Sequence, residues 1–290
     1  MPSFKSTHEL LYMIREKGLA LSEAAQEWEK EVSGRELTEI RQEMRERLLV
    51  MRQAARKGLE GNIKSPSGLI GGGGRLLEQA RKENKLVSGA TTARAITIAL
   101  AIAEVNACMG KIVAAPTAGS CGILPGVLLA LEEERKLSEE TVIDGMLAAA
   151  AVGVVMASMA SFSGAALGCQ AEVGAASAMA AAATVEMAGG SPLQALDAAA
   201  IALKGLMGLV CDPVGGLVEI PCVKRNALGA AHALAAADIA LAGLKSFIPL
   251  EEVIAAMVEV GKSLPSSLRE TAEGGIAACP TAKKIASRLT

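Results

Sequence analysis

Apolar residues recur at steps of three and four over most of the chain, the spacing of one face of an α-helix. In the first part of the sequence this spacing is kept by Leu37, Ile40, Met44, Leu48, Met51 and Ala55. Ser33-Gly34-Arg35-Glu36 resembles a capping box, so we expect one long amphipathic helix that ends near Gly58 or Gly61. Its other faces carry mixed Arg and Glu, which favours a solvated helix lying over the domain more than a dedicated binding surface.

Past residue 90 the helical segments are apolar on more than one side and are separated by Gly and Pro. They are predicted at Thr91–Met109, Ser138–Phe162, Glu172–Ala188, Pro192–Leu209, Asn226–Leu244 and Pro249–Lys262. The clearest boundary is Gly189 to Gln194, where Ser191 is a cap, Pro192 takes the first helical position and Gln194 completes a capping box. Sustained period-two alternation is missing, although Leu217–Val223 could be a short extended piece. The pattern predicts an all-α fold.

Charge is distributed unevenly along the chain. Half of the charged residues lie in the first 94 of 290 positions, so the front of the chain is more solvated than the rest. We expect residues 1–60 to form a charged helical segment that packs on a body formed by residues 61–290, where Ala-rich helices and Gly/Pro loops would build the site.

Composition narrows the class of protein. Hydrophobic residues make up 51% and charged residues 21%, with a net charge of −2, which excludes a disordered chain and a basic nucleic-acid binder. Aromatic residues are only 2%, while 30 residues are Gly. Small side chains allow helix backbones to approach closely, so we expect tightly packed helices rather than a β-sandwich.

A membrane protein is the main structural alternative, because the mean hydropathy is +0.37 and the 27 residues between Asp144 and Glu172 carry no charge. That stretch is mostly Ala, Gly and Ser, which gain little on transfer to lipid, and no Trp or Tyr flanks it. The first 21 residues are interrupted by charges and lack a secretory pattern. We therefore expect a cytoplasmic protein without a membrane partner, whose six cysteines are kept as thiols.

Four loops gather Gly, Pro, Ser, Thr or Cys between the helices, and loops on a helical scaffold are where sites are usually built. They are SPSGLIGGGG (65–74), AAPTAGSCGILPG (114–126), GCQAEVG (168–174) and CDPVGGLVEIPCVKRN (211–226). The glycine tract lacks a Walker A ending, and it is either an anion-binding nest or a flexible linker. The candidate residues for binding a small polar substrate are Ser65, Ser67, Thr117, Gly119 and Ser120.

Cys169, Cys211 and Cys222 each lie at a helix end or in one of these loops. Structural zinc is a weaker fit, because close cysteine pairs are missing. Three thiolates suit a cubane iron–sulfur cluster with one open iron that acts as a Lewis acid, while inert buried cysteines are the alternative. Cys108 follows an apolar run and is expected in the core.

Five stretches resemble the alpha chain of iron–sulfur-dependent L-serine dehydratases, over nearly the whole chain from about Ser65. They are CQAEVGAASAMAAA (169–182), GGSP (189–192), CDPVGGLVEIPCVKRNALGA (211–230), APTAGSCGILPG (115–126) and RETAEGGIA (269–277). The resemblance implies a lyase of amino-acid degradation and gluconeogenesis that converts L-serine to pyruvate and ammonia without pyridoxal phosphate. It implies a [4Fe-4S] cluster on Cys169, Cys211 and Cys222, and a separate beta chain as partner.

The catalytic base is the missing part. The chain has two histidines, and His232 is expected to pack on a helix. In the family the proposed base belongs to an SSSHT-type loop of the beta region, so the resemblance implies that the beta chain completes the site. The chain departs from some relatives at Lys204–Gly208, where they have an EHN-type segment. Cys121 stands where relatives commonly have Ala and is expected not to be a ligand, and whether Cys279 occupies the fourth iron is open.

Two other functions compete with this interpretation. A related cluster-dependent lyase acting on L-cysteine or L-threonine differs by one atom or one methyl group in its substrate, which leaves little trace in a sequence. A non-catalytic helical membrane or scaffold protein, in which the cysteines only pack, is the alternative of another class.

Overall fold

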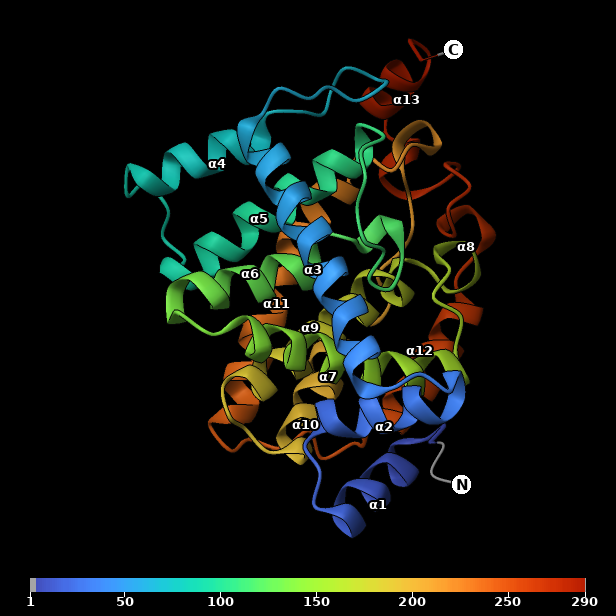
Figure 1. Ribbon diagram of the computed structural model, residues 1–290. Coiled ribbons are helices and arrows are strands. Elements are labelled where there is room, and N and C mark those ends of the chain that lie inside the picture. Colours follow the sequence, from blue (N-terminus) through green and yellow to red (C-terminus); the bar gives the residue numbers. More distant parts are fainter. Residues whose placement is uncertain (1–3, 290) are drawn as a thin grey trace.

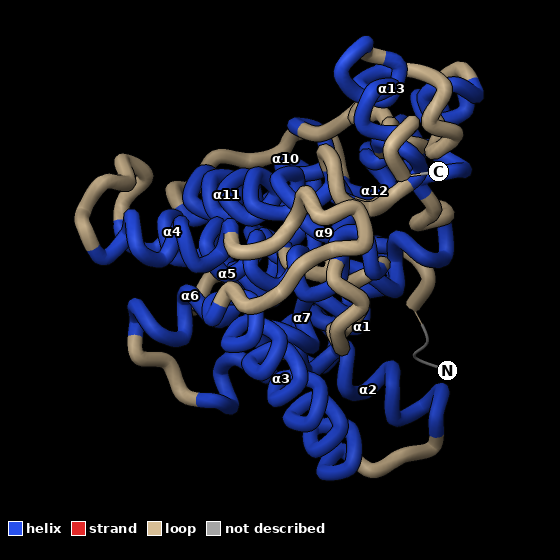
Figure 2. The backbone as a smooth tube through the Cα atoms, turned by 90° about the horizontal axis from the view of Figure 1, so that it is seen from above, coloured by secondary structure: helices blue, strands red, loops and turns tan. Residues whose placement is uncertain are grey.

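The computed structural model describes residues 4–289, and over this range the chain is built from helices and loops without a strand (Figures 1 and 2). The all-α expectation is confirmed. The α-helices of the described range are α1 (Thr7–Lys17), α2 (Leu21–Ser33), α3 (Leu37–Glu60), α4 (Gly73–Lys82), α5 (Ala90–Ala107), α6 (Ile123–Arg135), α7 (Glu139–Met159), α8 (Gly164–Leu167), α9 (Val173–Met187), α10 (Pro192–Gly205), α11 (Cys222–Leu241), α12 (Leu250–Ser263) and α13 (Pro280–Ala286). Short 3-10 turns join several of them, at Ala118–Ser120, Cys169–Ala171, Val214–Gly216, Ser266–Leu268 and Gly275–Ala278.

Helix α9 forms the centre of the molecule and packs against α6, α7, α10 and α11 (Figure 1). Every residue of α9 except Glu186 is buried, and half of the buried ones are Ala. Because an alanine side chain ends at Cβ, four neighbouring helices can approach this one closely on different sides. The small residues therefore allow a dense core with few aromatic rings.

Helix α3 runs along the outside of α5, α6 and α7 (Figure 1). Its apolar stripe, which includes Ile40, Leu48 and Met51, is buried as the sequence predicts. Its charged side is less solvated than expected. Arg41 Nη1 lies 2.8 Å from Asp144 Oδ1, and Arg52 Nη1 lies 2.5 Å from Glu139 Oε2, so arginines of α3 reach acidic groups of α7.

The predicted start of α3 is wrong by three residues. Ser33 is the last residue of α2, and its hydroxyl donates to Glu29 O at 2.7 Å. The next residue, Gly34, adopts φ 72°, a left-handed conformation that ends α2. Glu36 is the N-cap of α3, and its backbone N–H donates to Glu39 Oε2 at 2.9 Å. The real capping residues are thus two glutamates, whose pattern is less distinctive than Ser-x-x-Glu.

The six helices predicted past residue 90 are present with ends shifted by a few residues, and Ser191, Pro192 and Gln194 form the predicted capping box. Helix α6 was not predicted, because its first residues, Ile123–Gly126, were assigned to a loop. Leu217–Val223 is not a strand but a turn that leads into α11.

One helix of the described range, α7, is long and apolar enough to cross a membrane by composition alone. Of its most apolar window, 67% is buried inside the fold, as in a core helix.

Candidate active site

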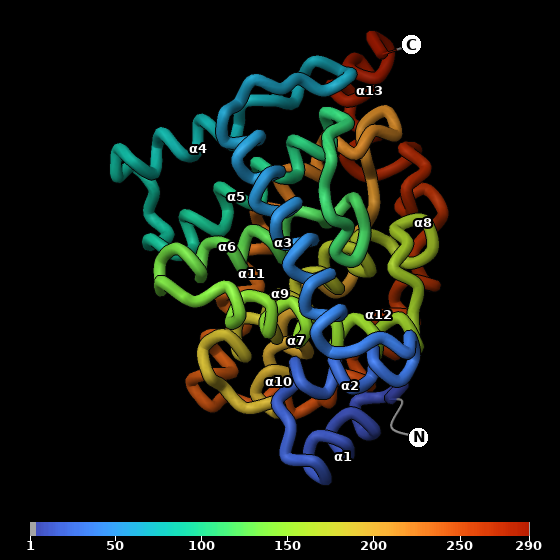
Figure 3. Tube along the Cα trace, in the orientation of Figure 1, coloured from blue at the N-terminus to red at the C-terminus, as the bar shows by residue number. Residues whose placement is uncertain are grey.

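The four loops singled out in the sequence gather at the end of the molecule that holds the C-terminus, away from the N-terminus (Figures 1 and 3). The loops before α4, before α6 and before α11 all lie there, together with α8 and α13. Helices α5, α9 and α11 begin or end at the same place, so three core helices support the loops.

The thiols of Cys169, Cys211 and Cys222 come from three separate segments and meet at this end. Cys169 begins the turn before α9, and Cys222 is the first residue of α11. The thiols of Cys169 and Cys211 lie close enough to shift each other's pKa, and the charge of Cys169 also acts on Cys222. Cys169 and Cys211 are each only 4% exposed. The thiols of Cys169 and Cys211 are thus neighbours, Cys222 lies within the range of their charges, and their joint role as ligands stays a prediction.

Burial and mutual contact determine the ionisation of these thiols. The hydrogen bond from Cys211 lowers the pKa of Cys169, and the same bond, followed by burial, raises the pKa of Cys211. Burial raises the pKa of the Cys222 thiol to about 12. Without a metal at least two of the three sulfurs are protonated at neutral pH, so a metal would displace protons as it binds.

The segment carrying Cys169 depends on a glycine. Gly168 has φ 80°, and a Cβ there would lie 2.9 Å from Leu209 O. The backbone N–H of Gln170 donates to that same Leu209 oxygen at 3.0 Å, so the turn with Cys169 is joined directly to the segment that leads to Cys211. A side chain at Gly168 would push these two segments apart.

The segment after α12 holds Cys211 through its backbone. Cys211 N–H donates to Leu268 O at 2.9 Å, and Glu270 N–H donates to Cys211 O at 2.7 Å. The neighbouring Asp212 accepts the N–H of Ile276 at 2.7 Å, and its Oδ1 lies 2.9 Å from Arg225 Nη1 as an ion pair. This is why the RETAEGGIA stretch belongs to the site although it contains no cysteine.

Glu172 stands beside the cysteines, one turn after Cys169. Thr117 Oγ1 donates to Glu172 Oε1 at 2.9 Å, and Thr117 Oγ1 is 3.1 Å from Ser120 Oγ. A Cβ on Gly119 would lie 3.2 Å from Glu172 Oε1. Burial, together with the charge of Glu270, raises the pKa of Glu172, while the Thr117 bond opposes this. Thr117 and Gly119 thus lie against this carboxylate, and Ser120 positions Thr117.

Asn226 connects the loop before α6 to the start of α11. Its amide nitrogen donates to Gly119 O at 2.8 Å and to Cys222 O at 3.0 Å, while its Oδ1 accepts Gly122 N–H at 2.8 Å. The side chain is 1% exposed and uses its donors and acceptor on backbone groups. Asn226 therefore fixes the distance between the Thr117 loop and Cys222.

Ser65 and Ser67 contact the loop that leads to Cys222. Ser65 Oγ donates to Glu219 Oε2 at 2.8 Å, and the Ser67 hydroxyl donates to the same oxygen. Glu219 is 5% exposed and has no cationic partner among the described residues. In this structure the two serines satisfy a buried carboxylate three residues before Cys222. Their substrate-binding role stays a prediction.

The glycine tract binds a carboxylate, and that carboxylate belongs to the chain itself. Gly73 N–H donates to Glu104 Oε1 at 2.8 Å, and Gly74 N–H donates to Glu104 Oε2 at 2.9 Å. The N-terminus of α4 is thus an anion nest occupied by Glu104, which is 3% exposed. The tract is neither a free linker nor an open anion site.

Replacing Glu104 by alanine is expected to lower the free energy of unfolding by about 2 kcal/mol, because the two N–H donors lose their acceptor. Glu46→Ala, at an exposed position of α3, is the matched control and should change stability by less than about 0.5 kcal/mol. Urea unfolding followed by circular dichroism measures both. Equal effects of the two changes would show that the nest contributes nothing.

Among the described residues, no hydrogen bond joins the other candidate residues to the three thiols. Cys121 is fully buried, and burial raises the pKa of its thiol to about 12. Cys108 caps α5 and is half-buried rather than in the core as predicted, because the helix ends there and its environment includes Glu104 and Glu219. Cys279 is exposed, and its thiol lies 3.9 Å from Gly275 O. His232 Nε2 is 2.8 Å from Ala202 O, so it packs against α10 as expected.

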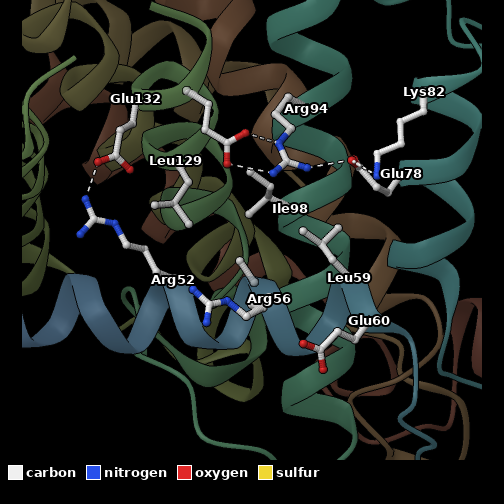
Figure 4. Close-up of a pocket in the computed structure, with 12 residues that line it drawn as sticks. Arg52, Arg56, Leu59, Glu60, Glu78, Lys82, Arg94, Ile98, Leu129 and Glu132 are labelled. Atoms are coloured by element: carbon white, nitrogen blue, oxygen red, sulfur yellow. Dashed lines mark hydrogen bonds and ion pairs between the residues drawn. The ribbon is translucent and has the colours of Figure 1, made fainter. Parts of the chain in front are cut away.

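A large surface pocket lies elsewhere, between α3, α4, α5 and α6 (Figure 4). Its charged groups already pair with one another. Arg94 Nε lies 2.6 Å from Glu133 Oε2, and Arg94 Nη1 lies 2.9 Å from Glu78 Oε2. Arg52 reaches Glu132 on the opposite side of the pocket. These ion pairs join the helices around the pocket. We therefore place the candidate active site at the cysteines and not at this pocket.

The donor set at the cysteines consists of soft sulfur ligands. Within residues 4–289, no group of three His, Cys, Asp or Glu side chains converges tightly enough to hold a single metal ion. A cluster of several irons makes a different demand, because each thiolate binds its own iron and the ligands surround a volume. Three thiols carried by separate segments, two of them buried, are compatible with the second arrangement.

Sequence reasoning missed Glu172, Glu219 and Asn226 as members of this site. All three lie within the loops that the sequence selected, at fixed positions relative to the cysteines: Glu172 follows Cys169 by three, Glu219 precedes Cys222 by three, and Asn226 follows it by four. The sequence signal that could have identified them is a polar residue in an apolar stretch, close to a candidate cysteine ligand.

Comparison with known proteins identifies the family of the chain. A family model described as "Serine dehydratase alpha chain" matches residues 16–277. The chain is 49% identical to the "Probable L-serine dehydratase, alpha chain" of Bacillus subtilis, over 99% of this chain and 95% of that protein. It is 42% identical to the "L-serine dehydratase, alpha chain" of Peptoniphilus asaccharolyticus, over 97% and 96%. An "L-serine dehydratase" of Streptomyces coelicolor is 38% identical, and there the match covers 94% of this chain but 60% of the longer relative.

Proposed function

Because the chain belongs to the serine dehydratase alpha chain family, we propose that it is the alpha chain of an L-serine dehydratase, a lyase that converts L-serine to pyruvate and ammonia. The observation that carries the proposal is the meeting of Cys169, Cys211 and Cys222 beside the Thr117 loop and Glu172. Two relatives aligned over almost their whole length are named for the same activity.

A [4Fe-4S] cluster on Cys169, Cys211 and Cys222 is the cofactor of this proposal. The chemistry of the donor set supports it, since three separate segments carry soft thiol ligands whose charges act on one another. A buried polar atom also supports it: Arg269 pairs through its backbone with Cys211, and its Nε has no hydrogen-bond partner in the described part of the chain. When bound, the cluster supplies a Lewis acid that binds the substrate carboxylate and hydroxyl and makes hydroxide a tolerable leaving group.

The protein residues hold the reacting molecule and exclude water. Cys169 and Cys211 are almost completely buried, and charge interactions are stronger where water is excluded. Thr117, Gly119 and Ser120 border the same space and remain the candidate substrate-binding residues of this loop, together with Ser65 and Ser67 across Glu219. Asn226 keeps the loop and Cys222 in register.

A beta chain supplies the base that removes the α-proton. Two facts support this part of the proposal. His232 is engaged with Ala202 O on α10, and His8 lies on α1 at the far end from the cysteine loops (Figure 1). The Streptomyces relative is much longer than the segment that matches this chain, which leaves room for a second unit in one polypeptide.

Residues 1–60 act in this proposal as a charged helical segment that buttresses a catalytic body at residues 61–290. The ion pairs from α3 to α7 and the burial of the apolar stripe of α3 support this division of roles. The cytoplasm is the proposed location, supported by the burial of α7, the most apolar long helix of the described range.

Loading and activity test the proposal together. Anaerobically purified protein is expected to contain iron and sulfide and to absorb broadly near about 400 nm, as iron–thiolate centres do. Pyruvate should form from L-serine only after the beta chain is added. Turnover of L-threonine and L-cysteine, measured in parallel, identifies the substrate. A colourless, iron-free protein after anaerobic reconstitution would contradict the cofactor, and faster turnover of another amino acid would contradict the substrate.

A further inference from the structure

We propose that Glu172 receives the α-ammonium group of the substrate and so makes the site select amino acids over acids that lack the amine. The inference rests on the proposed function, because it assigns one group of L-serine to one residue of that site. It adds a specificity-determining residue outside the three cysteines and the loop hydroxyls.

The position of Glu172 meets the first requirement, which is proximity to the reacting centre. A Cβ built on Gly164 would lie 2.8 Å from Glu172 Oε2 and 2.9 Å from Cys211 Sγ. The carboxylate oxygen and the sulfur therefore border the same small space above Gly164, which only a glycine leaves free. A molecule held at the cysteines lies within reach of this oxygen.

The orientation of the carboxylate meets the second requirement. Thr117 Oγ1 holds Oε1 at 2.9 Å, which leaves Oε2 without a hydrogen-bond donor among residues 4–289. Thr117 is itself fixed by Ser120, whose side chain is fully buried. One oxygen is thus used to aim the group, and the other is available to a ligand.

The other acidic groups of these loops already have donors. Glu104 accepts two backbone N–H groups, Asp212 accepts Ile276 N–H and pairs with Arg225, and Glu219 accepts the serine hydroxyls. No ion pair in the described range includes Glu172. Glu172 is therefore the half-buried carboxylate of the site with one oxygen, Oε2, that accepts no donor from residues 4–289.

Charge around Glu172 favours a cation as its ligand. The Glu270 carboxylate acts on Glu172 as a like charge, and the nearby Arg225 is occupied by Asp212. Two neighbouring negative charges in a poorly solvated place attract an ammonium group, which donates up to three hydrogen bonds. In L-serine, the ammonium is the group left over when the carboxylate and hydroxyl bind the metal.

Glu172→Gln tests the inference, because glutamine keeps the shape and can still accept the Thr117 bond. In the cluster-loaded complex with the beta chain, a lost charge-assisted hydrogen bond should raise KM for L-serine by about 10- to 100-fold. L-Alanine and propionate are unreactive probes that differ only in the amine. By calorimetry the variant should bind L-alanine about 10-fold or more weaker than the wild type and propionate within about 3-fold. Iron content and visible absorbance should be unchanged.

Two further variants complete the design. Glu252→Gln makes the same change at an exposed position of α12, outside the site, and should bind both probes as the wild type does. Glu172→Asp keeps the charge on a shorter side chain and should restore part of the preference for L-alanine. Equal weakening of alanine and propionate in Glu172→Gln, or an unchanged ratio, overturns the inference. Failure of the proposed function appears separately, as a wild-type complex that neither binds nor converts L-serine.

Discussion

Replacing Cys211 by serine is expected to abolish both the iron–sulfur chromophore and the activity. The anaerobically purified variant should lose the absorbance near about 400 nm, since a serine hydroxyl does not replace a thiolate on iron. Pyruvate formation should fall by at least about 10³-fold, because Lewis-acid assistance contributes several kcal/mol to the transition state and each 1.4 kcal/mol or so is a factor of ten. Iron analysis, the visible spectrum and a pyruvate assay with the beta chain present measure the effect.

The matched control is Cys108→Ser, which makes the same chemical change at a half-buried cysteine outside the thiol cluster. It should keep the iron, the chromophore and the activity. A Cys211→Ser protein that retains its iron and absorbance would remove Cys211 from the ligand set. Loss of iron in both variants would indicate instead that cysteine replacement disturbs the fold in general.

Replacing Gly58 by alanine is expected to lower the free energy of unfolding by about 3 kcal/mol or more, because no space exists for the methyl group. A Cβ at Gly58 would lie 2.2 Å from Ala101 O and 2.5 Å from Ala101 C, which are backbone atoms of α5. Helices α3 and α5 would have to separate. Thermal unfolding should show a midpoint lower by about 5–10 °C for a chain of this size.

Gly153→Ala is the matched control, since Gly153 also lies inside a helix, α7. A Cβ there would meet only Met179 Cε at 3.1 Å, at the end of a flexible side chain. The higher helix propensity of alanine should leave this variant as stable as the wild type or more stable, by up to about 1 kcal/mol. If both variants lost the same stability, close approach of α3 and α5 would not be the cause.

The parts of the fold that were predictable are those set by neighbours in sequence. Ser191, Pro192 and Gln194 cap α10 as expected, because a capping box needs only four consecutive residues. The same local reasoning failed where contacts between distant segments determine whether a stretch is a helix or a loop. Pro125 and Gly126 indicated a loop, yet they lie in the first turn of α6, where proline has no hydrogen bond to lose. A Cβ on Gly126 would lie 2.7 Å from Ala99 Cβ, so this glycine serves the packing of α5 and α6.

The residues of the candidate site also fall into those that local sequence predicts and those that it does not. Cys169, Cys211 and Cys222 could be chosen from the sequence, because cysteine is a recognisable metal-ligand type and all three lie in the selected loops or at helix ends. Glu172 was not selected, because its importance depends on Thr117, which is 55 positions away in the chain. The glycine tract was recognised as a possible nest, but its occupant, Glu104, lies on another helix 31 positions from Gly73. Such contacts are made by the fold and have no local pattern.

The backbone bonds around Cys211 have a consequence for the order in which the protein is made. Cys211 pairs with Leu268 and Glu270, and Asp212 pairs with Ile276, all of which follow it by more than fifty positions. During synthesis the chain emerges from its N-terminus, so Cys169, Cys211 and Cys222 leave the ribosome before the segment that fixes the middle one. A nascent chain can therefore fold its core around α9 while the loop with Cys211 still lacks its backbone partners from residues 268–276. The proposed cluster would then be loaded only after residues 268–276 have been made and have paired with this loop.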